Sequence, residues 1–425
     1  MIGSRLIPAR WILARLALRS VARNRRRTAL TVLVVAAGFL AMALAGGFMA
    51  QTFSALSDAA IRGGLGHLQV MDAKALQDQE DASLQFALPD GEALAGKLRA
   101  LPEVAEVLPR IQFMGLLTNG SRSVAYLGTA VDPAREPRFM AVADQVKDAA
   151  ALPGGAGSRW LAADPTAREV VLGPGLAKAL GASVGSSLTL MATTKDGALN
   201  AVDVTVVGLV DQGVKELNDR ALLTSLATAE ALLDAGGARS RLSVVLKEPG
   251  RLAEGLAAVR GALDPGETAL PWTDLAAFFK QVRLLYLFIF GFMGLVLFLV
   301  VWLATANTLL MSVMERVREF GVLRAVGLRP GQLVRLLQWE GATLGAIGGL
   351  LGLAATLALR AAANAARIQM PAPPGSAHGY PLHIEAVPLV YLGTFLFLQL
   401  TLQVAALYPG LKAAKLRIVE ALRHV

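Results

Sequence analysis

The sequence predicts a membrane protein with an α-helical transmembrane domain of four helices and a large α+β domain between helices 1 and 2. Three features of the 425-residue chain predict this class. Hydrophobic residues make up 54% of it and gather in four runs of bilayer length. About half of the chain, residues 55–280, has no such run and carries 21 Lys and Arg against 27 Asp and Glu, a net charge of −6. The remainder carries 20 basic and 5 acidic residues, a net charge of +15 at the flanks of the apolar runs.

The first apolar run follows a basic segment. Residues 1–27 contain eight Arg and no acidic residue, and residues 28–54 are predominantly apolar. A cleaved signal peptide also combines a basic flank with an apolar run, but its apolar core is about 7–15 residues long. About 20 apolar residues are needed to cross a bilayer, so the length favours an uncleaved transmembrane helix 1. The Arg cluster predicts a cytoplasmic, basic N-terminus.

Residues 55–280 alternate short β-branched and apolar runs with short helical patterns, which predicts an external α+β domain. A Pro- and Gly-rich segment at 150–165 predicts a subdomain boundary. The predicted strands cover residues 67–71, 104–117, 123–131, 169–172, 187–191, 202–210, 242–246 and 268–270. The predicted helices cover residues 91–101, 175–180, 227–233 and 252–263.

The second half of the chain contains three more apolar runs, separated by one basic and one proline-rich connection. The positive-inside rule places the basic connection in the cytoplasm and therefore the proline-rich one outside. The C-terminal segment is also basic, so both termini are predicted to be cytoplasmic. The predicted segments are helix 2 at 281–310, a cytoplasmic loop at 311–338, helix 3 at 339–360, an external loop at 361–385, helix 4 at 386–409 and a cytoplasmic C-terminus at 410–425.

The loop at 311–338 has the pattern of a short amphipathic helix. Apolar residues recur at spacings of three and four, Gly327 suits the end of a helix, and Pro330 suits the first turn of the next. The helix-spaced apolar residues are Val313, Val317, Phe320, Leu323 and Val326. Such a helix, with Phe320 and Leu323 projecting, fits either a groove on another protein or the lipid surface. Periodicity alone does not choose between these two structures.

The string ERVREFGVLRAVGLRPGQL, residues 315–333, resembles the signature loop of the FtsX-like permease family of ABC transporters. That family includes the MacB-, LolC- and LolE-like (type VII) permeases, and its pattern is approximately E-R-x-R-E-[IF]-G-x-L-R-A-x-G. In the family this loop is the coupling helix that docks on an ATP-binding cassette subunit, so the resemblance favours the protein groove. It implies that the docking residues are Glu315, Arg316, Glu319, Phe320, Gly321, Leu323, Arg324 and Gly327.

Two other segments resemble the same family. Residues 66–70, GHLQV, resemble a segment that follows the first membrane helix in LolE-like members. Residues 409–423 resemble the C-terminal pattern of the family, except at Ile418, where the family usually has Pro. The order of MacB-like folds also implies a discontinuous periplasmic domain. Its implied parts are a porter-like unit at 60–131 and 240–275 and an inserted lobe at 132–239.

The residues indicate no enzyme chemistry in this chain. No G-x-x-x-x-G-K-[ST] string occurs, so we expect ATP and Mg²⁺ to bind to a partner ATPase subunit. The absence of Cys excludes disulfides and thiolate chemistry. His378 and His383 with Glu385 form the one cluster of possible metal ligands, and their spacing is more typical of a solvated loop than of a zinc site. No basic stripe with interleaved aromatic residues indicates nucleic acid as a partner.

Predicted helix 3 carries glycines at four-residue spacings, which let helix backbones approach closely. Packing within the subunit is a simpler explanation than a dimer face. One row consists of Gly341, Gly345 and Gly349, and an overlapping row consists of Gly348 and Gly352. Glu340, near the cytoplasmic interface, is expected to pair with Arg335 or with a partner subunit.

The resemblance implies a permease subunit of a bacterial inner membrane that works by mechanotransmission. ATP hydrolysis in two copies of a separate ATPase subunit would move the periplasmic domain, and a second permease copy or a paralogue would complete the complex among membrane lipids. The segment at 66–70 favours lipoprotein or lipid release, with a lipoprotein chaperone as a further partner. Two alternatives remain open: a MacB-like efflux or secretion permease with a periplasmic adaptor, and a signalling permease that transports nothing.

Overall fold

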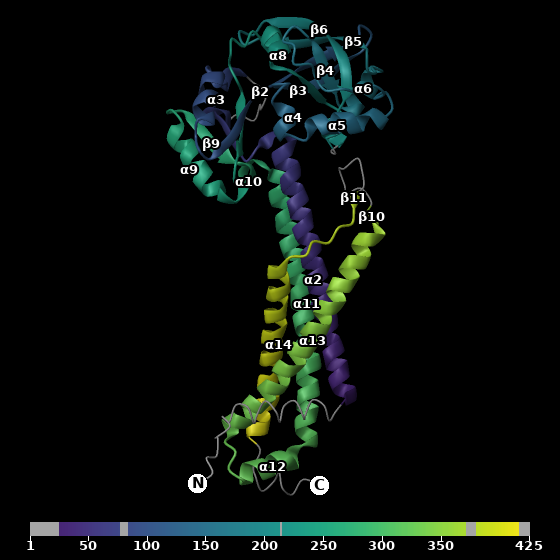
Figure 1. Ribbon diagram of the computed structural model, residues 1–425, viewed down its shortest axis with the longest axis vertical. Helices are drawn as coiled ribbons and strands as arrows, with labels where there is room; N and C mark the ends of the chain where they lie inside the picture. Colours follow the sequence, from purple (N-terminus) through teal and green to yellow (C-terminus); the bar gives the residue numbers. More distant parts are fainter. Residues whose placement is uncertain (1–24, 77–83, 213–214, 371–379, 416–425) are drawn as a thin grey trace, which may run out of the picture. The chain divides into compact units, whose positions relative to one another are not determined.

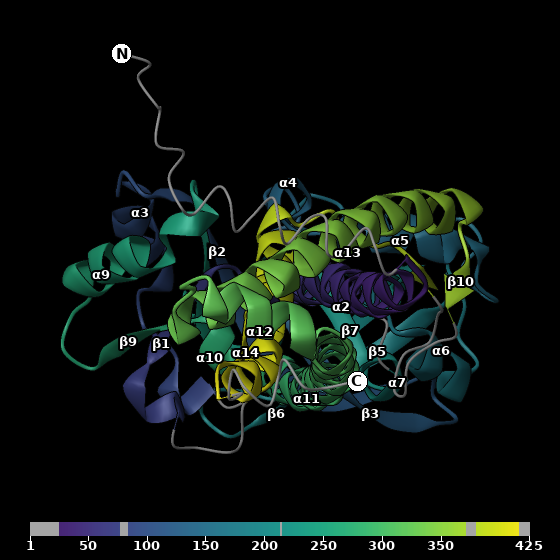
Figure 2. The same cartoon turned by 90° about the horizontal axis from the view of Figure 1, so that it is seen from below.

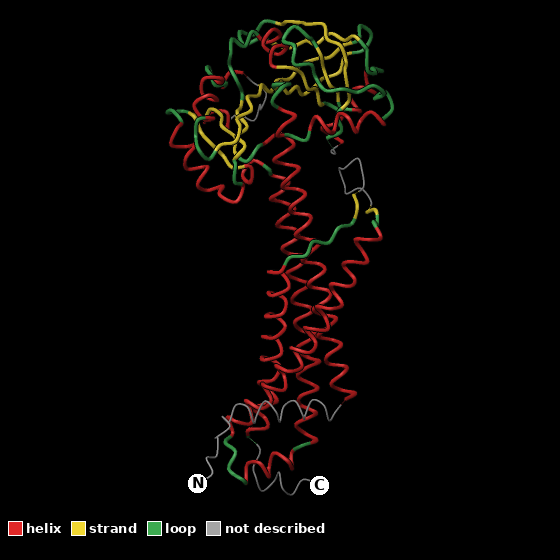
Figure 3. Tube along the Cα trace, viewed as in Figure 1, coloured by secondary structure: helices red, strands yellow, loops and turns green. Residues whose placement is uncertain are grey.

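The computed structural model describes residues 25–76, 84–212, 215–370 and 380–415. These residues form two compact units. The membrane unit contains the chain up to Phe53, Val282–Gln369 and the chain from Pro381, and the ectodomain contains Ser54–Gln281. Figure 3 shows long helices in the membrane unit and a concentration of strands in the ectodomain.

Four long helices make up most of the membrane unit, and each is long and apolar enough to cross a membrane. They are α2 (Arg25–Ala60), α11 (Ala277–Glu315), α13 (Pro330–Ala366) and α14 (Pro388–Ala414) (Figure 1). Each extends beyond its predicted apolar run, because helical hydrogen bonding continues past the point where side chains become polar. The predicted loop at 311–338 is therefore mostly helical, with the end of α11, the short helix α12 (Val317–Ala325) and the start of α13.

The predicted external loop and the chain ends are described only in part. Helix α13 runs to Ala366, and the short strands β10 (Gln369–Met370) and β11 (Tyr380–Pro381) lie in the predicted loop at 361–385. Helix α14 continues through Pro409, past its predicted end. The predicted features that lie outside the described residues are the N-terminal segment 1–24, the part of the external loop at 371–379 with His378, and the C-terminal segment 416–425 with Ile418.

The ectodomain is an α+β domain built on one nine-stranded sheet with the order β3-β7-β4-β6-β5-β2-β8-β1-β9. Its strands are β1 (Leu68–Asp72), β2 (Val104–Thr118), β3 (Ser123–Val131), β4 (Glu169–Leu172), β5 (Ser187–Thr193), β6 (Leu199–Leu209), β7 (Ala221–Ser225), β8 (Arg241–Leu246) and β9 (Glu267–Pro271). Each predicted strand is present, and β7 is additional. Because β7 is buried throughout its length, its sequence lacks the alternation that reveals a strand.

Short helices connect these strands. They are α3 (Gly91–Arg99), α4 (Glu136–Phe139), α5 (Val142–Asp148), α6 (Pro174–Leu180), α7 (Lys215–Asn218), α8 (Leu226–Leu233), α9 (Leu252–Ala262) and α10 (Trp272–Leu275). Single 3₁₀ turns lie at Ala73–Leu76, Leu84–Phe86, Ala149–Ala151 and Pro249–Arg251. A π-helical turn, η1 (Ile61–Leu65), follows α2.

Six of the strands close into a ring, which we call the barrel lobe. Strand β2 pairs with β5 on one side and with β3 on the other, so the order β2-β3-β7-β4-β6-β5 returns to β2. Large apolar side chains fill one core in this lobe, including Phe113, Tyr126 and Leu190. The rings of Phe113 and Tyr126 meet edge to face with centroids 5.7 Å apart.

The other strands form the open-sheet lobe. Strands β8, β1 and β9 continue the sheet from the first half of β2. Helices α3 and α9 pack on these strands through a separate apolar core that includes Leu68, Leu98, Val244 and Val259.

Strand β2 belongs to both lobes. This corrects one predicted boundary, and the burial of Leu161 corrects another. Its residues pair with β8 as far as Arg110 and with β3 from Ile111 onward. The boundary predicted between 131 and 132 is therefore wrong, because β3 and the second half of β2 lie in the barrel-lobe core. The boundary predicted at 150–165 is also wrong, since Leu161 is buried in a cluster with Val146 and Val207. A sequence pattern marks strands and turns but not which strands pair.

Candidate partner-docking site at helix α12

Helix α12 lies at one end of the membrane unit (Figure 1) and follows α11 and precedes α13 in the chain; Figure 2 views the molecule from this end. Arg316 separates it from α11, because its φ of −114° and ψ of 19° are not helical. Gly327 follows α12 with a φ of +106°, a conformation that favours glycine. The sequence predicted one continuous helical spacing across Arg316. The helix is interrupted there, yet Val313 before the break and Phe320 after it still lie in one buried cluster.

The side chain of Phe320 is buried, so the expectation that it projects is wrong. It is 1% exposed and packs in a cluster with Val313 of α11, Leu333 of α13 and Ala413 of α14. Phe320 therefore joins α12 to three other helices of the same chain. The residues on the buried side of α12 are Val317, Phe320 and Gly321, with Leu323 partly buried.

Arg316 is the centre of a charge cluster beside α12. Its Nε donates to Glu319 Oε2 at 2.8 Å, and its Nη1 donates to Glu340 Oε1 at 3.0 Å. The guanidinium also lies 5.1 Å from the ring centroid of Phe320. The expected pairing of Glu340 with Arg335 is wrong: these residues are five apart on α13, which puts them on different faces of the helix. The Glu340 side chain is only 3% exposed, and Arg316 supplies the compensating charge.

Two further predicted docking residues have partners within the chain. Glu315, the last residue of α11, forms an ion pair with Arg27 of α2 at 2.7 Å. Arg324 Nη1 donates to the main-chain oxygen of Ala414, the last residue of α14, at 3.2 Å. These contacts tie the α12 region to the ends of α2 and α14.

The opposite side of α12 is exposed and combines apolar with charged residues. We call it the open face. Val326 is 83% exposed and Val322 is 47% exposed. The other exposed residues of this face are Arg318, Glu319 and Ala325. The residues expected to dock on a partner did not include Arg318, Val322 or Ala325, although their spacing of four and three residues marks a shared face.

The glycine rows of α13 pack against other helices of the chain. A methyl group on Gly349 would lie 2.7 Å from the ring of Phe395 in α14, and one on Gly352 would lie 2.6 Å from Cβ of Phe39 in α2. Close helix packing in a membrane depends on such small residues. The glycines facing α14 are Gly341, Gly345 and Gly349, and those facing α2 are Gly348 and Gly352.

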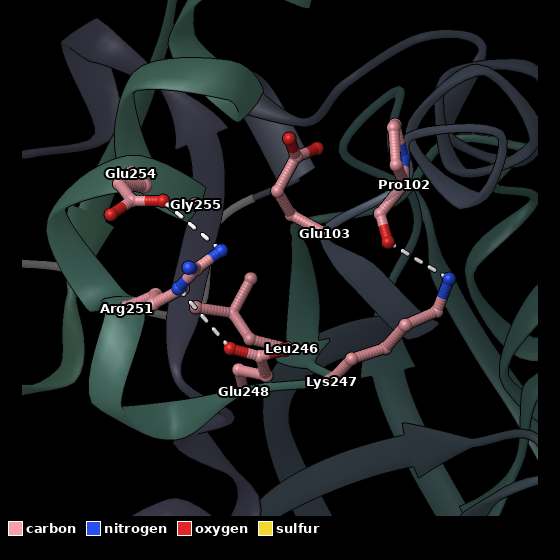
Figure 4. A pocket seen from close by; sticks show the side chains of 8 residues that line it. All are labelled: Pro102, Glu103, Leu246, Lys247, Glu248, Arg251, Glu254 and Gly255. Carbon is pink, nitrogen blue, oxygen red and sulfur yellow. Dashed lines mark hydrogen bonds and ion pairs between the residues drawn. The ribbon is translucent and has the colours of Figure 1, made fainter.

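The ectodomain contains a cavity of about 190 Å³ in the open-sheet lobe, between the start of β2, the end of β8 and α9 (Figure 4). Arg251 pairs there with Glu248 at 3.2 Å and with Glu254 at 3.6 Å, and Lys247 donates to the carbonyl of Pro102 at 2.8 Å. Arg251 balances these two carboxylates and Lys247 bonds to a main-chain carbonyl, whereas Glu103 Oε2 is buried with no hydrogen-bond partner among the described residues. Within the described part of the chain, no three His, Asp or Glu side chains are placed to hold a metal ion.

Two family models cover most of the chain. The MacB-like periplasmic core domain matches residues 28–262, which is more than half of the chain, and the FtsX-like permease C-terminal domain matches residues 291–418. This chain belongs to the MacB- and FtsX-like family of ABC transporter permeases. The family inferred from residues 315–333 is confirmed, and so is the fold class of the permease.

The permease resembles several named proteins over parts of its length. It is 29% identical over 200 residues to the lipoprotein-releasing system transmembrane protein LolC of Neisseria meningitidis serogroup B, covering 43% of this chain and 46% of LolC. It is 31% identical over 151 residues to the uncharacterized ABC transporter permease YknZ of Bacillus subtilis, covering 36% of this chain and 35% of YknZ. The permease thus spans about half, or less, of the length of these relatives. The solved periplasmic region of MacB from Actinobacillus actinomycetemcomitans aligns over 52% of this chain and 95% of that chain, with 15% identity and a TM-score of 0.31.

Proposed function

We propose that this permease works with a separate ATP-binding subunit that docks on the open face of α12. The architecture of α12 carries the proposal: one side is locked among α11, α13 and α14 by Phe320, and the other side, around Val322 and Val326, is open. Apolar residues beside an arginine are a composition that protein interfaces favour. In this proposal the partner binds ATP and Mg²⁺, in two copies per permease dimer.

Contacts on the buried side of α12 connect it to the membrane helices, so a partner that displaces α12 also displaces those helices. A displacement of α12 acts on Glu340 of α13 through Arg316 and on the end of α14 through Arg324. The Arg27–Glu315 pair connects α2 to the same region. Since packed side chains transmit displacement, closure of the ATP-binding subunits moves the helices by mechanotransmission and needs no polar path between them.

The proposed orientation places α12 and both termini in the cytoplasm and the ectodomain in the periplasm of an inner-membrane protein. The net charge of −6 over residues 55–280 against +15 elsewhere supports it. Because the chain has no Cys, single cysteines report accessibility directly. An impermeant maleimide should label Asp196→Cys in spheroplasts and should not label Arg329→Cys. The reverse pattern would contradict this orientation.

The proposed substrate is a lipid-anchored protein or a lipid, and an exposed apolar wall of the barrel lobe supports it. Met114 is 55% exposed, Leu116 is 47% exposed and Leu127 is 38% exposed. Met114 lies opposite Leu127, and Leu116 lies between Ala125 and Met191 on neighbouring strands. Exposed apolar side chains grouped in this way suit an acyl chain better than a polar solute, although charged residues such as Asp196 and Arg220 lie beside them. The named activity of LolC, lipoprotein release, agrees with this substrate class.

A second permease copy or paralogue is proposed to cover part of α11. Phe288 and Phe292 are each 70% exposed there, and both lipid and a second helix suit such residues. A lipoprotein chaperone in the periplasm would complete a release system. A periplasmic adaptor in its place would indicate efflux or secretion, and a periplasmic enzyme or sensor kinase would indicate signalling.

Purification of the tagged permease from its native membrane tests the proposal. We expect an ATP-binding cassette subunit to co-purify, with ATPase activity that depends on the permease. Lipoprotein transfer from proteoliposomes to a soluble chaperone then tests the substrate, and Leu116→Glu should slow transfer without lowering the ATPase rate. A complex that contains no ATP-binding subunit would contradict the proposed function.

A further inference from the structure

We propose that Arg110 and Glu136 form a positioning pair that fixes the ectodomain end of α2 against both lobes of the ectodomain. Three elements meet at this pair. Arg110 lies in β2, Glu136 is the first residue of α4, and Gly64 lies in the turn η1 that follows α2. All three residues belong to the ectodomain unit.

Arg110 is the residue at which β2 passes from one lobe to the other. It is the last residue of β2 to pair with β8, opposite Arg241, and Ile111 is the first to pair with β3. The carbonyl oxygen of Arg110 accepts hydrogen bonds from the main-chain N–H and the hydroxyl of Ser240, at 3.0 and 3.1 Å. The backbone at Arg110 is therefore held firmly while its side chain reaches across to α4.

The pair is buried between the lobes. Arg110 is 7% exposed, Glu136 is 0% exposed, and Arg110 Nη2 donates to Glu136 Oε1. Burial raises the pKa of the Glu136 carboxyl, and the charge of Arg110 opposes that rise. Among the described residues, Arg110 Nε and Glu136 Oε2 have no hydrogen-bond partner. Replacement of a buried ion pair by apolar side chains of similar volume is often neutral or stabilising, so stability alone does not explain this pair.

The turn that ends α2 is held by three contacts at the same place. Ser243 Oγ of β8 donates to the carbonyl of Gly64 at 2.7 Å, and the main-chain N–H of Ala141 donates to the carbonyl of Arg62 at 3.1 Å. The third contact is steric, because a methyl group on Gly64 would overlap Arg110 Nη1. Gly64 has a φ of +134°, which favours glycine and lets the guanidinium approach the backbone.

The arrangement links α2 to the open-sheet lobe through Ser243 and to the barrel lobe through Ala141, with the Arg110–Glu136 pair between them. The hydrogen bond from Arg110 to Glu136 prefers a defined angle, and the attraction between the two charges weakens as they separate. The pair therefore fixes one position of α4 relative to β2 and to the helix end. That this joint also passes motion from α2 to the barrel lobe rests on the proposed function.

Distance measurements between spin labels test the positioning directly. Ala59 in α2, Ala201 in β6 and Ala257 in α9 are exposed, and the chain has no other cysteine to label. In lipid nanodiscs without any ATPase, the Ala59→Cys/Ala201→Cys protein should give one narrow distance distribution. Adding Arg110→Met with Glu136→Leu removes both charges together, so no buried charge is left unpaired. We expect this protein to keep its thermal midpoint but to lose the single narrow peak.

A matched double substitution controls for the loss of an ion pair. Arg159 and Glu169 pair at 2.5 Å within the barrel lobe, so Arg159→Met with Glu169→Leu should leave the narrow distribution unchanged. If the Arg110→Met, Glu136→Leu protein does not fold, Gly64→Ala disturbs the same joint with both charges present and should shift or broaden the distribution. An unchanged distribution in the variants of this joint would overturn the proposal.

The role in transmission has a separate readout in the complex with the ATP-binding subunit. The Arg110→Met, Glu136→Leu complex should hydrolyse ATP but lose the ATP-induced change in the distance between Ala59 and Ala201. The distance between Ala59 and Ala257 separately measures the position of the end of α2 relative to the open-sheet lobe. If no ATP-binding subunit binds, the proposed function fails, and the nanodisc measurement still decides the positioning.

Discussion

The ectodomain and the membrane unit differ in where they leave large apolar residues exposed. In the ectodomain, side chains such as Phe113 are buried in closed cores. In the membrane unit, Phe288 and Phe292 are largely exposed. Its helices bury apolar clusters around Phe39 and Phe320 and also meet at glycines and at hydrogen bonds such as Thr31 to Thr308 at 2.9 Å. Water drives apolar burial in the ectodomain, whereas lipid removes that drive and leaves close packing and hydrogen bonds to hold the helices together.

Replacing one phenylalanine by alanine in each unit should give the largest difference in the free energy of unfolding. Phe113→Ala leaves a cavity in the barrel lobe and should lower the free energy of unfolding by about 3–5 kcal/mol. Phe292→Ala removes a side chain that is exposed on α11 and should change it by less than about 0.5 kcal/mol, as is usual for exposed positions. Thermal unfolding of the full chain in detergent, followed by tryptophan fluorescence, measures both. Equal losses would remove the distinction between the units.

Enlarging a glycine should have a smaller effect that appears where helices touch. A side chain at Gly345 would overlap Gln399 of α14, so Gly345→Leu should destabilise the membrane unit by about 1–3 kcal/mol through overpacking. Gly393→Leu in α14 is the control, because nothing lies within 4 Å of a Cβ added there. Yield of monodisperse protein and thermal midpoint in detergent report the difference. If Gly345→Leu is as stable as Gly393→Leu, this side of α13 faces lipid.

The smallest expected effect is a pH dependence of the stability of the ectodomain. Burial lowers the pKa of the His67 imidazole, whose Nδ1 accepts a hydrogen bond from the main-chain N–H of Leu246 at 3.2 Å. An unfolded histidine titrates near pH 6.5, so below that pH the unfolded chain gains a proton that the folded chain resists. Stability should therefore fall as the pH decreases from about 7 through 6.5.

His67→Asn isolates this effect, because the asparagine oxygen can accept the same hydrogen bond and does not titrate. The difference in thermal midpoint between the parent and His67→Asn cancels the titration of other groups. The thermal midpoint of His67→Asn should rise relative to that of the parent as the pH falls from about 7 to 5.5. A difference that does not depend on pH would show that His67 does not contribute in this way.

The sequence predicted what depends on local pattern, and it failed where distant residues meet. Hydropathy located the four long helices, and alternation located the strands apart from the uniformly buried β7. Strand pairing is not local, so the division of β2 between two lobes was missed. At the candidate site, the motif predicted a helix with an apolar face, but helices α13 and α14 of the same chain cover Phe320 on that face, and no local pattern reveals this packing. The Arg316–Glu340 and Arg110–Glu136 pairs join residues 24 and 26 positions apart, beyond the reach of any helical or strand period.

The central claim is that the open face of α12, and not the Phe320 side, docks the ATP-binding subunit. The most direct test measures binding of that subunit to the permease in nanodiscs, with Ala325→Asp compared with Ala257→Asp, since both alanines are exposed on helices. The carboxylate introduced by Ala325→Asp would place a charge within an apolar contact, so this variant should lose binding at an unchanged thermal midpoint, while Ala257→Asp should bind normally. Full binding by Ala325→Asp, with normal ATP hydrolysis and transport, would contradict the claim.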